Sequence, residues 1–453
     1  MSCSHRPVGA ALCAGLFSIL LVRDLYSAEV ADAARPALTP SRDSSLIARA
    51  PTVLTLTQAE RLALERHPLL AQSREQIEAS RARAVYSGQL PDPQLKLGVE
   101  NLPVNSFTLN RDGMTQVMVG VSQMFPPPGK LALTQRGAEQ ETAAAQARRR
   151  DLEARIQREV RRAWLDLYYQ DRALDVVRLN LALADQMVSV IRVRYRTGQG
   201  EQADLLKAQL QRGDLVDQQE ALLAARRVAQ SRLARLLDVS AERLVVPAEP
   251  PPLPSVPSEQ RLLQNLSRHP QVQALQSEIR ARRYELAAAR RDYYPEFGVE
   301  AAYGYRAARE ANGDKLPDMI SFGVVMSLPL FTAERQDRRA RERRAQWLAA
   351  RYQRDDLLLE LHQEIEARYA ELRRLKARLE LLQRELLPQS EQTVAATLAA
   401  YRAGRMSIAE VLRARRESLD YALRRWRLTT DAALAVADLD YLAAAMTESS
   451  HER

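Results

Sequence analysis

The sequence carries one pattern twice, and this duplication restricts the possible folds more than any other feature. Four marks occur in the same order in each half: a His-Pro pair, a proline, a second proline after an apolar stretch, and a Tyr-Arg-x-Gly sequence. They are His67-Pro68, Pro93, Pro126 and Tyr195–Gly198 in the first half, and His269-Pro270, Pro295, Pro329 and Tyr401–Gly404 in the second. Matching order and spacing indicate two copies of one structural unit.

Each half is predicted to begin with two helices separated by its His-Pro pair. The first helix covers residues 57–66 in one half and residues 258–268 in the other. Proline disfavours helical geometry in the preceding residue but fits the first position of a helix, so a second helix starts at each pair. We interpret the two histidines as helix caps and not as metal ligands.

Two strand-like stretches follow these helices in each half. Leu95, Leu97 and Val99 alternate with polar residues or glycine, a period of two that is typical of strands with one apolar face. Polar residues between the stretches predict a turn, so each half contains a hairpin. The first hairpin is expected at residues 94–125, with strands at 94–109 and 115–125, and the second at residues 296–331, with strands at 296–306 and 319–331.

A very long helix is predicted after the first hairpin. No proline or glycine occurs between Ala138 and Thr197, and the apolar residues there recur with the period of a coiled-coil seam. The predicted rod at residues 131–197 would be about 100 Å long. A globular core cannot enclose such a rod, so it must pack against other rods.

The second half repeats this arrangement. Its rod is predicted at residues 332–403, and Pro388, which has no counterpart in the first half, should kink it. Gly198 and Gly404 permit the left-handed backbone geometry that ends a helix. Return helices are therefore predicted after the two glycines, at residues 202–237 and 407–445.

These elements divide the chain into segments. The apolar run Val8–Val22 is typical of a secretory signal peptide, which we assign to residues 1–33 with cleavage after Ala28 or Ala33. No later run of apolar residues is long enough for a membrane-spanning helix, which favours an exported protein of the periplasm or outer membrane. The remaining segments are a first repeat at 53–239, a proline-rich extended connector at 240–257, a second repeat at 258–446 and a disordered tail at 447–453.

Residue types argue against an enzyme or a nucleic-acid-binding protein. The 66 basic and 57 acidic residues are interspersed, without the basic stripe and stacking aromatics that nucleic-acid binding needs. The two cysteines, Cys3 and Cys13, lie in the predicted signal peptide, so the mature chain has no thiol. No phosphate-binding loop or nucleophile motif is present, and we predict no cofactor, metal site or catalytic residue. Met114, Met118 and Met124 are interpreted as strand-packing residues, with metal handling as the alternative.

The predicted strands are long enough to cross a bilayer when tilted. Strands cross a bilayer only in a closed barrel, because an open edge leaves backbone groups without hydrogen bonds in hydrocarbon. Four strands cannot enclose a pore, whereas three copies would supply twelve. The predicted fold class is mainly α with a small β part. Long coiled-coil helical hairpins and four strands per chain would trimerise into a twelve-stranded transmembrane barrel, continued by a periplasmic helical tunnel.

Over essentially all of Val53–Met446 the chain resembles the TolC-like outer-membrane efflux family. The resemblance rests on the duplicated order of elements and on three motifs, which are Tyr195–Leu206, Tyr401–Leu412, and Ser122–Pro126 followed by Pro128-Gly129-Lys130. It implies a homotrimer surrounded by outer-membrane lipid in a Gram-negative bacterium, with a periplasmic tunnel. It also implies two partners, a periplasmic adaptor and a proton-driven RND-type pump of the inner membrane.

Within that family, Asn101-Leu102-Pro103 and Met114-Thr115 resemble the channels of heavy-metal cation efflux systems. The resemblance therefore implies a passive exit duct of a tripartite efflux system for heavy-metal cations. Multidrug efflux and type I secretion are alternatives within the same family. Alternatives of a different class are a periplasmic adaptor, which usually has one long hairpin, and a structural coiled-coil protein, which leaves the strand hairpins unexplained.

The candidate functional site is the end of the tunnel where the rods reverse. Some relatives place acidic residues just before this end, but no acid occurs at residues 186–200 or 392–409 here. The candidates either close the tunnel and meet the adaptor, or only cap the turns. These candidates are Tyr195, Arg196, Gly198 and Asp204 in the first repeat and Tyr401, Arg402, Gly404 and Glu410 in the second. A second set, at the strand-to-rod junction, is Pro126, Gly129 and Pro329.

Overall fold

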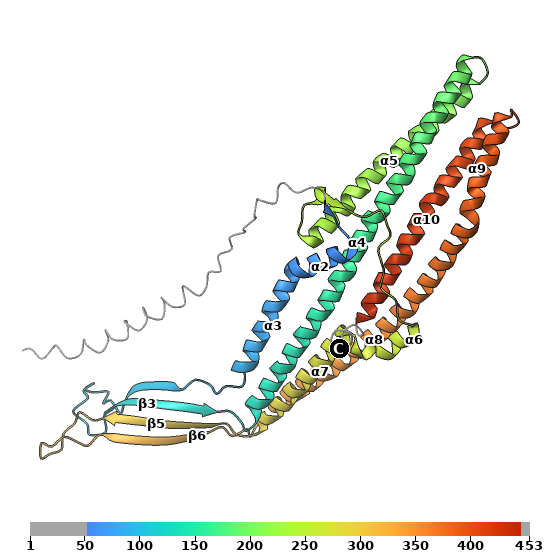
Figure 1. The fold of residues 1–453 in the computed structure, drawn as a ribbon. Helices are drawn as coiled ribbons and strands as arrows, with labels where there is room; N and C mark the ends of the chain where they lie inside the picture. The colour runs from blue at the N-terminus through green and yellow to red at the C-terminus, as the bar shows by residue number, and fades with distance from the viewer. Residues whose placement is uncertain (1–51, 445–453) are drawn as a thin grey trace, which may run out of the picture. The chain divides into compact units, whose positions relative to one another are not determined.

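The computed structural model describes residues 52–444, which form a mainly helical body with one four-stranded sheet (Figure 1). The predicted signal peptide at residues 1–33 and the predicted tail at residues 447–453 lie outside the described residues. Within the described part, the elements of the two halves follow the same order. The structure therefore contains the duplication that the sequence marks indicate.

The first half contains two short helices, three strands and one long helical hairpin. These elements are β1 (Thr52–Val53), α2 (Leu56–Arg66), α3 (Pro68–Tyr86), β2 (Gln94–Glu100), β3 (Gln116–Phe125), α4 (Lys130–Arg196) and α5 (Gln202–Leu237). The long helix α4 has 67 residues and is therefore about 100 Å long.

The second half contains the corresponding elements after a short connection. They are α6 (Glu259–Asn265), α7 (Pro270–Ala289), β5 (Phe297–Tyr305), β6 (Met319–Met326), α8 (Gln336–Leu381), α9 (Leu387–Arg402) and α10 (Ile408–Leu442). Short 3₁₀ turns at Leu266–Arg268 and Arg290–Tyr293 extend α6 and α7.

Both His-Pro pairs cap helices, as the sequence predicts. The Nδ1 atom of His67 accepts a hydrogen bond from the backbone N–H of Leu69 at 3.3 Å. The Nδ1 atom of His269 accepts one from Gln271 at the same distance. In each case proline is the first helical residue, where its missing N–H costs nothing.

Two predicted strands are too long. The strand expected at residues 94–109 ends at Glu100, because Asn101 adopts a left-handed backbone conformation with φ of 54°. The strand expected at residues 319–331 ends at Met326. Apolar alternation alone does not show where backbone pairing stops, and the apolar residues beyond Met326 have no strand partner within the described chain.

The second rod passes through a π-helical turn where the sequence predicts a kink. Leu382–Leu386 form this turn between α8 and α9, and the N–H of Leu387 bonds to the carbonyl of Leu382, five residues earlier. Pro388 follows at once and has no N–H to donate. The wider turn accommodates proline within a continuous helical segment, so the rod runs from Gln336 to Arg402 without a non-helical break.

The connector between the halves is not extended throughout. Its first part contains a 3₁₀ turn, Ala241–Arg243, and strand β4 (Leu244–Val245), which pairs in parallel with β1. The connector therefore returns to the start of the first repeat before it crosses to the second. Residues 246–257 carry no helix or strand, in agreement with their high proline content.

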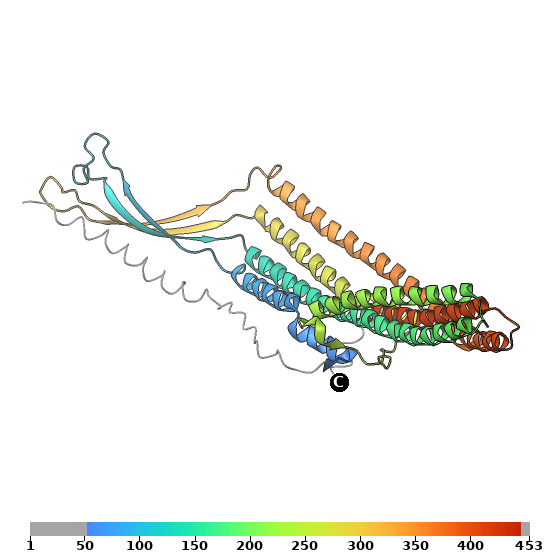
Figure 2. The ribbon, with the colours of Figure 1, turned by 90° about the horizontal axis from the view of Figure 1, so that it is seen from above.

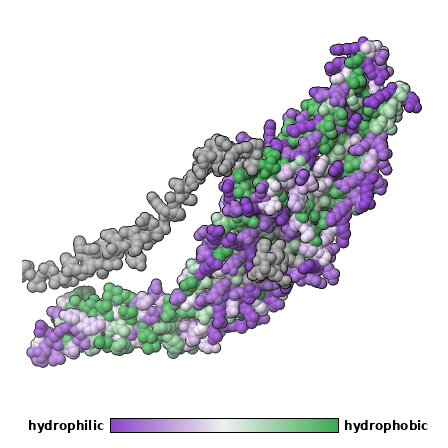
Figure 3. Space-filling model, in the orientation of Figure 1, coloured by the Kyte–Doolittle hydropathy of each residue, from purple (hydrophilic) through white to green (hydrophobic). Residues whose placement is uncertain are grey.

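The four long strands form one sheet in the order β2-β3-β5-β6, and all neighbours are antiparallel. Strands β3 and β5 come from different halves, so the two hairpins join within a single chain. Strands β2 and β6 are the edges of this sheet. Figure 3 shows apolar side chains over the strands and polar side chains at the ends of the hairpins.

The helices pack through separate apolar clusters and not through one globular core. Helix α4 contacts α3, α5, α7 and α10, so it joins the two halves along its length (Figures 1 and 2). The largest buried side chain is Trp164, whose indole N–H donates to the carbonyl of Leu54 at 2.9 Å. Trp164 stacks on Tyr168, with ring centroids 5.6 Å apart. A second cluster surrounds Leu361, Ile365 and Leu439.

Candidate functional site

Both rods reverse through the same glycine-centred turn. Gly198 and Gly404 have φ of 72° and 70°, in the left-handed region predicted for them. The residue after each glycine donates its N–H to a carbonyl five residues earlier, from Gln199 to Arg194 at 2.8 Å and from Arg405 to Ala400 at 3.0 Å. This hydrogen bond defines a Schellman-type helix end. The capping role of the two glycines is therefore confirmed.

The two reversals, which we call the tips, contact each other within one chain. The Arg194 guanidinium lies over the ring of Tyr401, 5.0 Å from its centroid. Just below this contact an apolar cluster joins both halves, formed by the buried residues Val188, Ile191, Ala208, Ile408 and Val411. The sequence candidates include Tyr401 but omit Arg194. Only the contact between repeats distinguishes Arg194 from the neighbouring arginines Arg192 and Arg196.

The other tip candidates do not form a network within the chain. Arg196 and Arg402 are exposed, and neither has an ion pair within residues 52–444. Asp204 lies in the first turn of α5, where a carboxylate is favoured by the helix dipole. Glu410 lies in the first turn of α10 and pairs with Arg413 at 3.1 Å. Tyr195 is 42% exposed.

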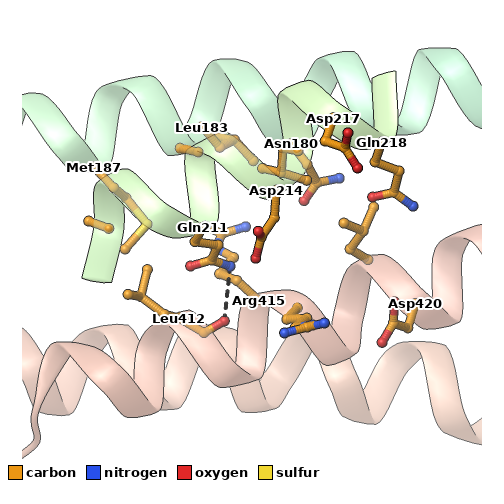
Figure 4. A pocket seen from close by; sticks show the side chains of 15 residues that line it. Asn180, Leu183, Met187, Gln211, Asp214, Asp217, Gln218, Leu412, Arg415 and Asp420 are labelled. Carbon is orange, nitrogen blue, oxygen red and sulfur yellow. Dashed lines mark hydrogen bonds between the residues drawn. The ribbon is translucent and has the colours of Figure 1, made fainter. Parts of the chain in front are cut away.

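A polar cavity separates the tip cluster from the next apolar contact along the rods. It has a volume of about 380 Å³ and lies between α4, α5 and α10 (Figure 4). Asp214, Asp217 and Asp420 line it, together with Arg415. The Gln211 side chain bridges the two halves beside it, since its Nε2 donates to the carbonyl of Leu412 at 3.2 Å. The seam between repeats is therefore apolar at the tip, polar at this cavity and apolar again at Val177, Leu215 and Leu419.

The strand-to-rod junction begins with three prolines and a glycine. Pro126, Pro127 and Pro128 cannot donate backbone hydrogen bonds, which stops strand pairing after Phe125. Gly129 then adopts φ of 77° and caps α4. Pro329 occupies the corresponding place after β6.

A carboxylate between two helices holds the junction together. Asp292 accepts ion pairs from Lys130 of α4 at 2.7 Å and from Arg339 of α8 at 2.8 Å. Its side chain is only 10% exposed. Burial alone would raise the pKa of Asp292, but the hydrogen bonds and charges of Lys130 and Arg339 outweigh burial and lower it. Asp292 is not among the candidates from the sequence, because only the fold brings α4 and α8 to its two sides.

We expect Asp292→Asn to lower the free energy of unfolding by about 1–2 kcal/mol at neutral pH. A carboxyl with a lowered pKa stabilises the fold above its unfolded pKa, about 3.9, and this contribution is lost as pH falls through the folded pKa. The difference between wild type and variant should therefore disappear in acid. Thermal unfolding across a pH series measures it. Glu334→Gln, which removes an exposed ion pair with Arg338, is the control and should change little.

The sheet has one apolar and one polar face. Its register places Leu97, Val119, Tyr303 and Ile320 in one row across the four strands, and Leu95, Val121, Ala301 and Phe322 in the next row on the same face. The opposite face carries Lys96, Gly120, Ala302 and Ser321 in one row. On that face Lys96 donates to Glu300, an ion pair that links the two halves. The sheet is therefore suited to separate lipid from water.

Two remaining observations concern membrane-spanning helices and metal-binding clusters in the described residues. No helix between residues 52 and 444 is long and apolar enough to cross a membrane. In the same residues, no three His, Cys, Asp or Glu side chains lie close enough together to hold a metal ion.

Duplicated strand hairpins joined to reversing helical rods define the subunit of an outer-membrane channel. A model of the outer membrane efflux protein family matches residues 60–240 and 262–445, which cover most of both repeats. The chain therefore belongs to the outer membrane efflux protein family. Its location is the outer membrane of a Gram-negative cell, with the helical part in the periplasm. This family assignment sets aside the periplasmic adaptor and the structural coiled-coil protein.

Individual relatives are distant in sequence but share the fold. The outer membrane efflux protein BepC of Brucella suis biovar 1 (strain 1330) is 22% identical over 215 residues, which are 48% of this chain and 47% of BepC. The chain thus spans about half the length of this curated relative. A membrane protein from Pseudomonas aeruginosa aligns with a TM-score of 0.73 and 20% identity over 85% of this chain and 93% of that chain. CusC, whose structures concern folding and transmembrane channel formation, aligns with a TM-score of 0.69 and 17% identity over 88% and 95%.

Proposed function

We propose that three copies of this chain form the passive exit duct of a tripartite efflux system. The observation that carries the proposal is the four-stranded sheet, which combines an apolar face with two unpaired edges, β2 and β6. Unpaired edges are not tolerated in hydrocarbon. If β6 of one copy pairs with β2 of the next, the backbone groups of both edge strands form hydrogen bonds. Three copies paired in this way close a twelve-stranded barrel. The polar face then lines the pore, and the rods continue its wall into the periplasm.

In this proposal the chain performs no chemistry. An RND-type pump of the inner membrane selects and drives the substrate, and a periplasmic adaptor joins the pump to the tips of the rods. The exposed charges at the tips, including Arg196 and Arg402, support an encounter with protein partners.

The proposed substrates are heavy-metal cations. The two sequence marks that suggest this branch lie against each other at the end of the first hairpin. Thr115 donates its hydroxyl to the carbonyl of Asn101 at 2.8 Å, and the Asn101 amide donates to the carbonyl of Met114 at 3.3 Å. The left-handed backbone of Asn101 makes this mutual contact possible. These hydrogen bonds hold the two sequence marks together in one contact.

Deletion of the gene tests the substrate. We expect the deletion strain to become sensitive to salts of heavy-metal cations, while its tolerance of dyes and detergents stays unchanged. Restoration by the wild-type gene shows that the effect belongs to this channel. Unchanged metal tolerance together with lost tolerance of dyes and detergents would overturn the metal assignment in favour of multidrug efflux. Loss of a secreted protein from the medium would favour type I secretion.

We propose further that Arg196 and Arg402 hold the tips of neighbouring copies together. The double reversal Arg196→Glu with Arg402→Glu should open the tunnel, because both side chains are exposed and lack an ion pair within one described chain. We expect a several-fold rise in single-channel conductance and in antibiotic uptake. Arg344→Glu, an exposed arginine at the opposite end of the rods, is the control. Unchanged conductance and uptake in the double variant would contradict the assignment.

A further inference from the structure

One row of the sheet contains two methionines separated by glycine. Strand register aligns Gly98 of β2 with Met118 of β3, Met118 with Gly304 of β5, and Gly304 with Met319 of β6. Apolar alternation along single strands does not reveal this row, because its members come from four segments of the chain. Only the pairing of β3 with β5 brings the methionines of the two repeats into one row.

These methionines lie on the polar face of the sheet. In β3 Met118 is an even number of residues from Gly120 and Ser122, and in β6 Met319 is likewise on the face of Ser321 and Gly323. The apolar face carries the alternate residues. Packing against lipid therefore does not explain Met118 and Met319.

Gly304 has no side chain of its own between the two methionines, but side chains of β3 reach over it. A Cβ atom added to Gly304 would lie nearest to the Gln116 carboxamide and 3.2 Å from the Met118 sulfur, so both side chains reach over the β5 backbone. The backbones of Met118 and Met319 are two strand spacings apart, about 9.6 Å. Met319 is 48% exposed and its side chain is flexible. Once the Gln116 side chain rotates away from Gly304, the two sulfurs can meet above that glycine with a metal ion between them.

We propose that Met118 and Met319 form a binding site for a soft monovalent cation, Cu(I) or Ag(I), on the inner wall of the barrel. The inference deepens the proposed function and rests on it, because the polar face lines the pore only in the closed barrel. Thioethers are soft, uncharged ligands that select such cations over hard divalent ions. Two neutral ligands hold the ion weakly, which suits a site that a permeating ion must also leave.

The same sheet contains a natural comparison for this site. Met124 of β3 aligns with Gly298 of β5, and a Cβ atom on Gly298 would lie 2.6 Å from the Met124 sulfur. The next residue in that row, on β6, is Val325 instead of a methionine. This second row therefore has the same glycine and the same overlying thioether but only one sulfur ligand.

Silver titration of the purified full-length trimer in detergent tests the proposal, with binding followed by calorimetry. We expect one Ag(I) ion per chain at this site. Met118→Leu and Met319→Leu should each weaken its binding by at least about tenfold, since even the loss of an outer-shell partner typically weakens metal binding by about that much. Met124→Leu should leave it unchanged. Val325→Met should add a second silver ion per chain, because it completes the second row.

A pH series separates thioethers from other silver ligands. Methionine has no proton to lose, so the affinity should be constant between about pH 6 and 8, whereas histidine binds more weakly as it protonates. Circular dichroism and trimer size confirm that each leucine variant folds. Absence of silver binding by the wild type, or equal binding by Met118→Leu, Met319→Leu and Met124→Leu, would overturn the inference.

The inference and the proposed function fail in different ways. If deletion of the gene leaves tolerance of all heavy-metal salts unchanged, the metal efflux assignment fails, whereas sensitivity to other heavy-metal salts with unchanged tolerance of silver and copper contradicts only the methionine site. If deletion sensitises the cells but the channel carrying both Met118→Leu and Met319→Leu restores full tolerance and binds silver like the wild type, only the methionine site fails. We expect the double variant to restore tolerance only in part, and Met124→Leu to restore it fully.

Discussion

Replacement of Phe322 by lysine is expected to remove most of the protein from the outer membrane. Phe322 lies within β6, is 82% exposed in a single chain and pairs with Ala301 on the apolar face. A lysine on the lipid side of a barrel costs about 2–4 kcal/mol near the middle of the bilayer. A trimer incurs this cost three times. The amount of trimer in the purified outer-membrane fraction measures the effect.

Ser321→Lys is the matched control, because Ser321 precedes Phe322 in the same strand but lies on the opposite face, in register with Ala302. In the proposed barrel its lysine faces water and should leave assembly almost unchanged. Equal amounts of trimer from the two variants would contradict our assignment of the faces. A greater loss with Ser321→Lys would reverse it.

Replacement of Asp438 by asparagine is the second large effect that we expect. Asp438 lies on α10 and is 3% exposed. It pairs with Arg162 of α4 at 2.6 Å and with Arg368 of α8 at 3.4 Å, so one carboxylate links rods of both repeats. Removing one partner of a buried pair leaves uncompensated charge and typically costs 3–5 kcal/mol.

Because both arginines retain some contact with water, we expect a loss of about 3 kcal/mol, the lower end of that range. Thermal unfolding of the helices, followed by far-ultraviolet circular dichroism, measures it. Glu380→Gln serves as the control, since it removes an exposed ion pair with Arg384, and such pairs contribute less than about 1 kcal/mol. Equal melting temperatures for Asp438→Asn and the wild type would show that the carboxylate does not hold the repeats together.

Local features of this fold could be predicted from sequence because they depend on short-range backbone chemistry. The histidine caps, the left-handed glycines and the order of helices and strands each follow from a few neighbouring residues. The errors were also local. The strand after Pro93 stops at Glu100 because of the geometry of Asn101, and the strand expected to reach residue 331 ends at Met326.

The residues that join the elements at the tips and at the junction were harder to predict, because they depend on contacts between distant segments. Arg194 differs from Arg192 and Arg196 only in facing Tyr401 of the second repeat. Asp292 matters because it lies between Lys130 and Arg339. In each case the rotation of one helix relative to its neighbour determines which charged residue makes the contact. The charge pattern of a single helix does not determine that rotation.

The sequence by itself determined the duplication, the class of fold and the ends of the rods. These features depend on the apolar periodicity and on the helix-ending residues, which are local properties of the sequence. The tertiary structure alone decided that β3 pairs with β5, which joins the hairpins of the two repeats into one sheet. That pairing sets the cross-strand register, and the register places Met118 and Met319 in one row on the polar face. Strands that pair can be far apart in the sequence, and several strand edges have similar hydrogen-bonding groups. Which edges pair is therefore determined only when the whole chain packs.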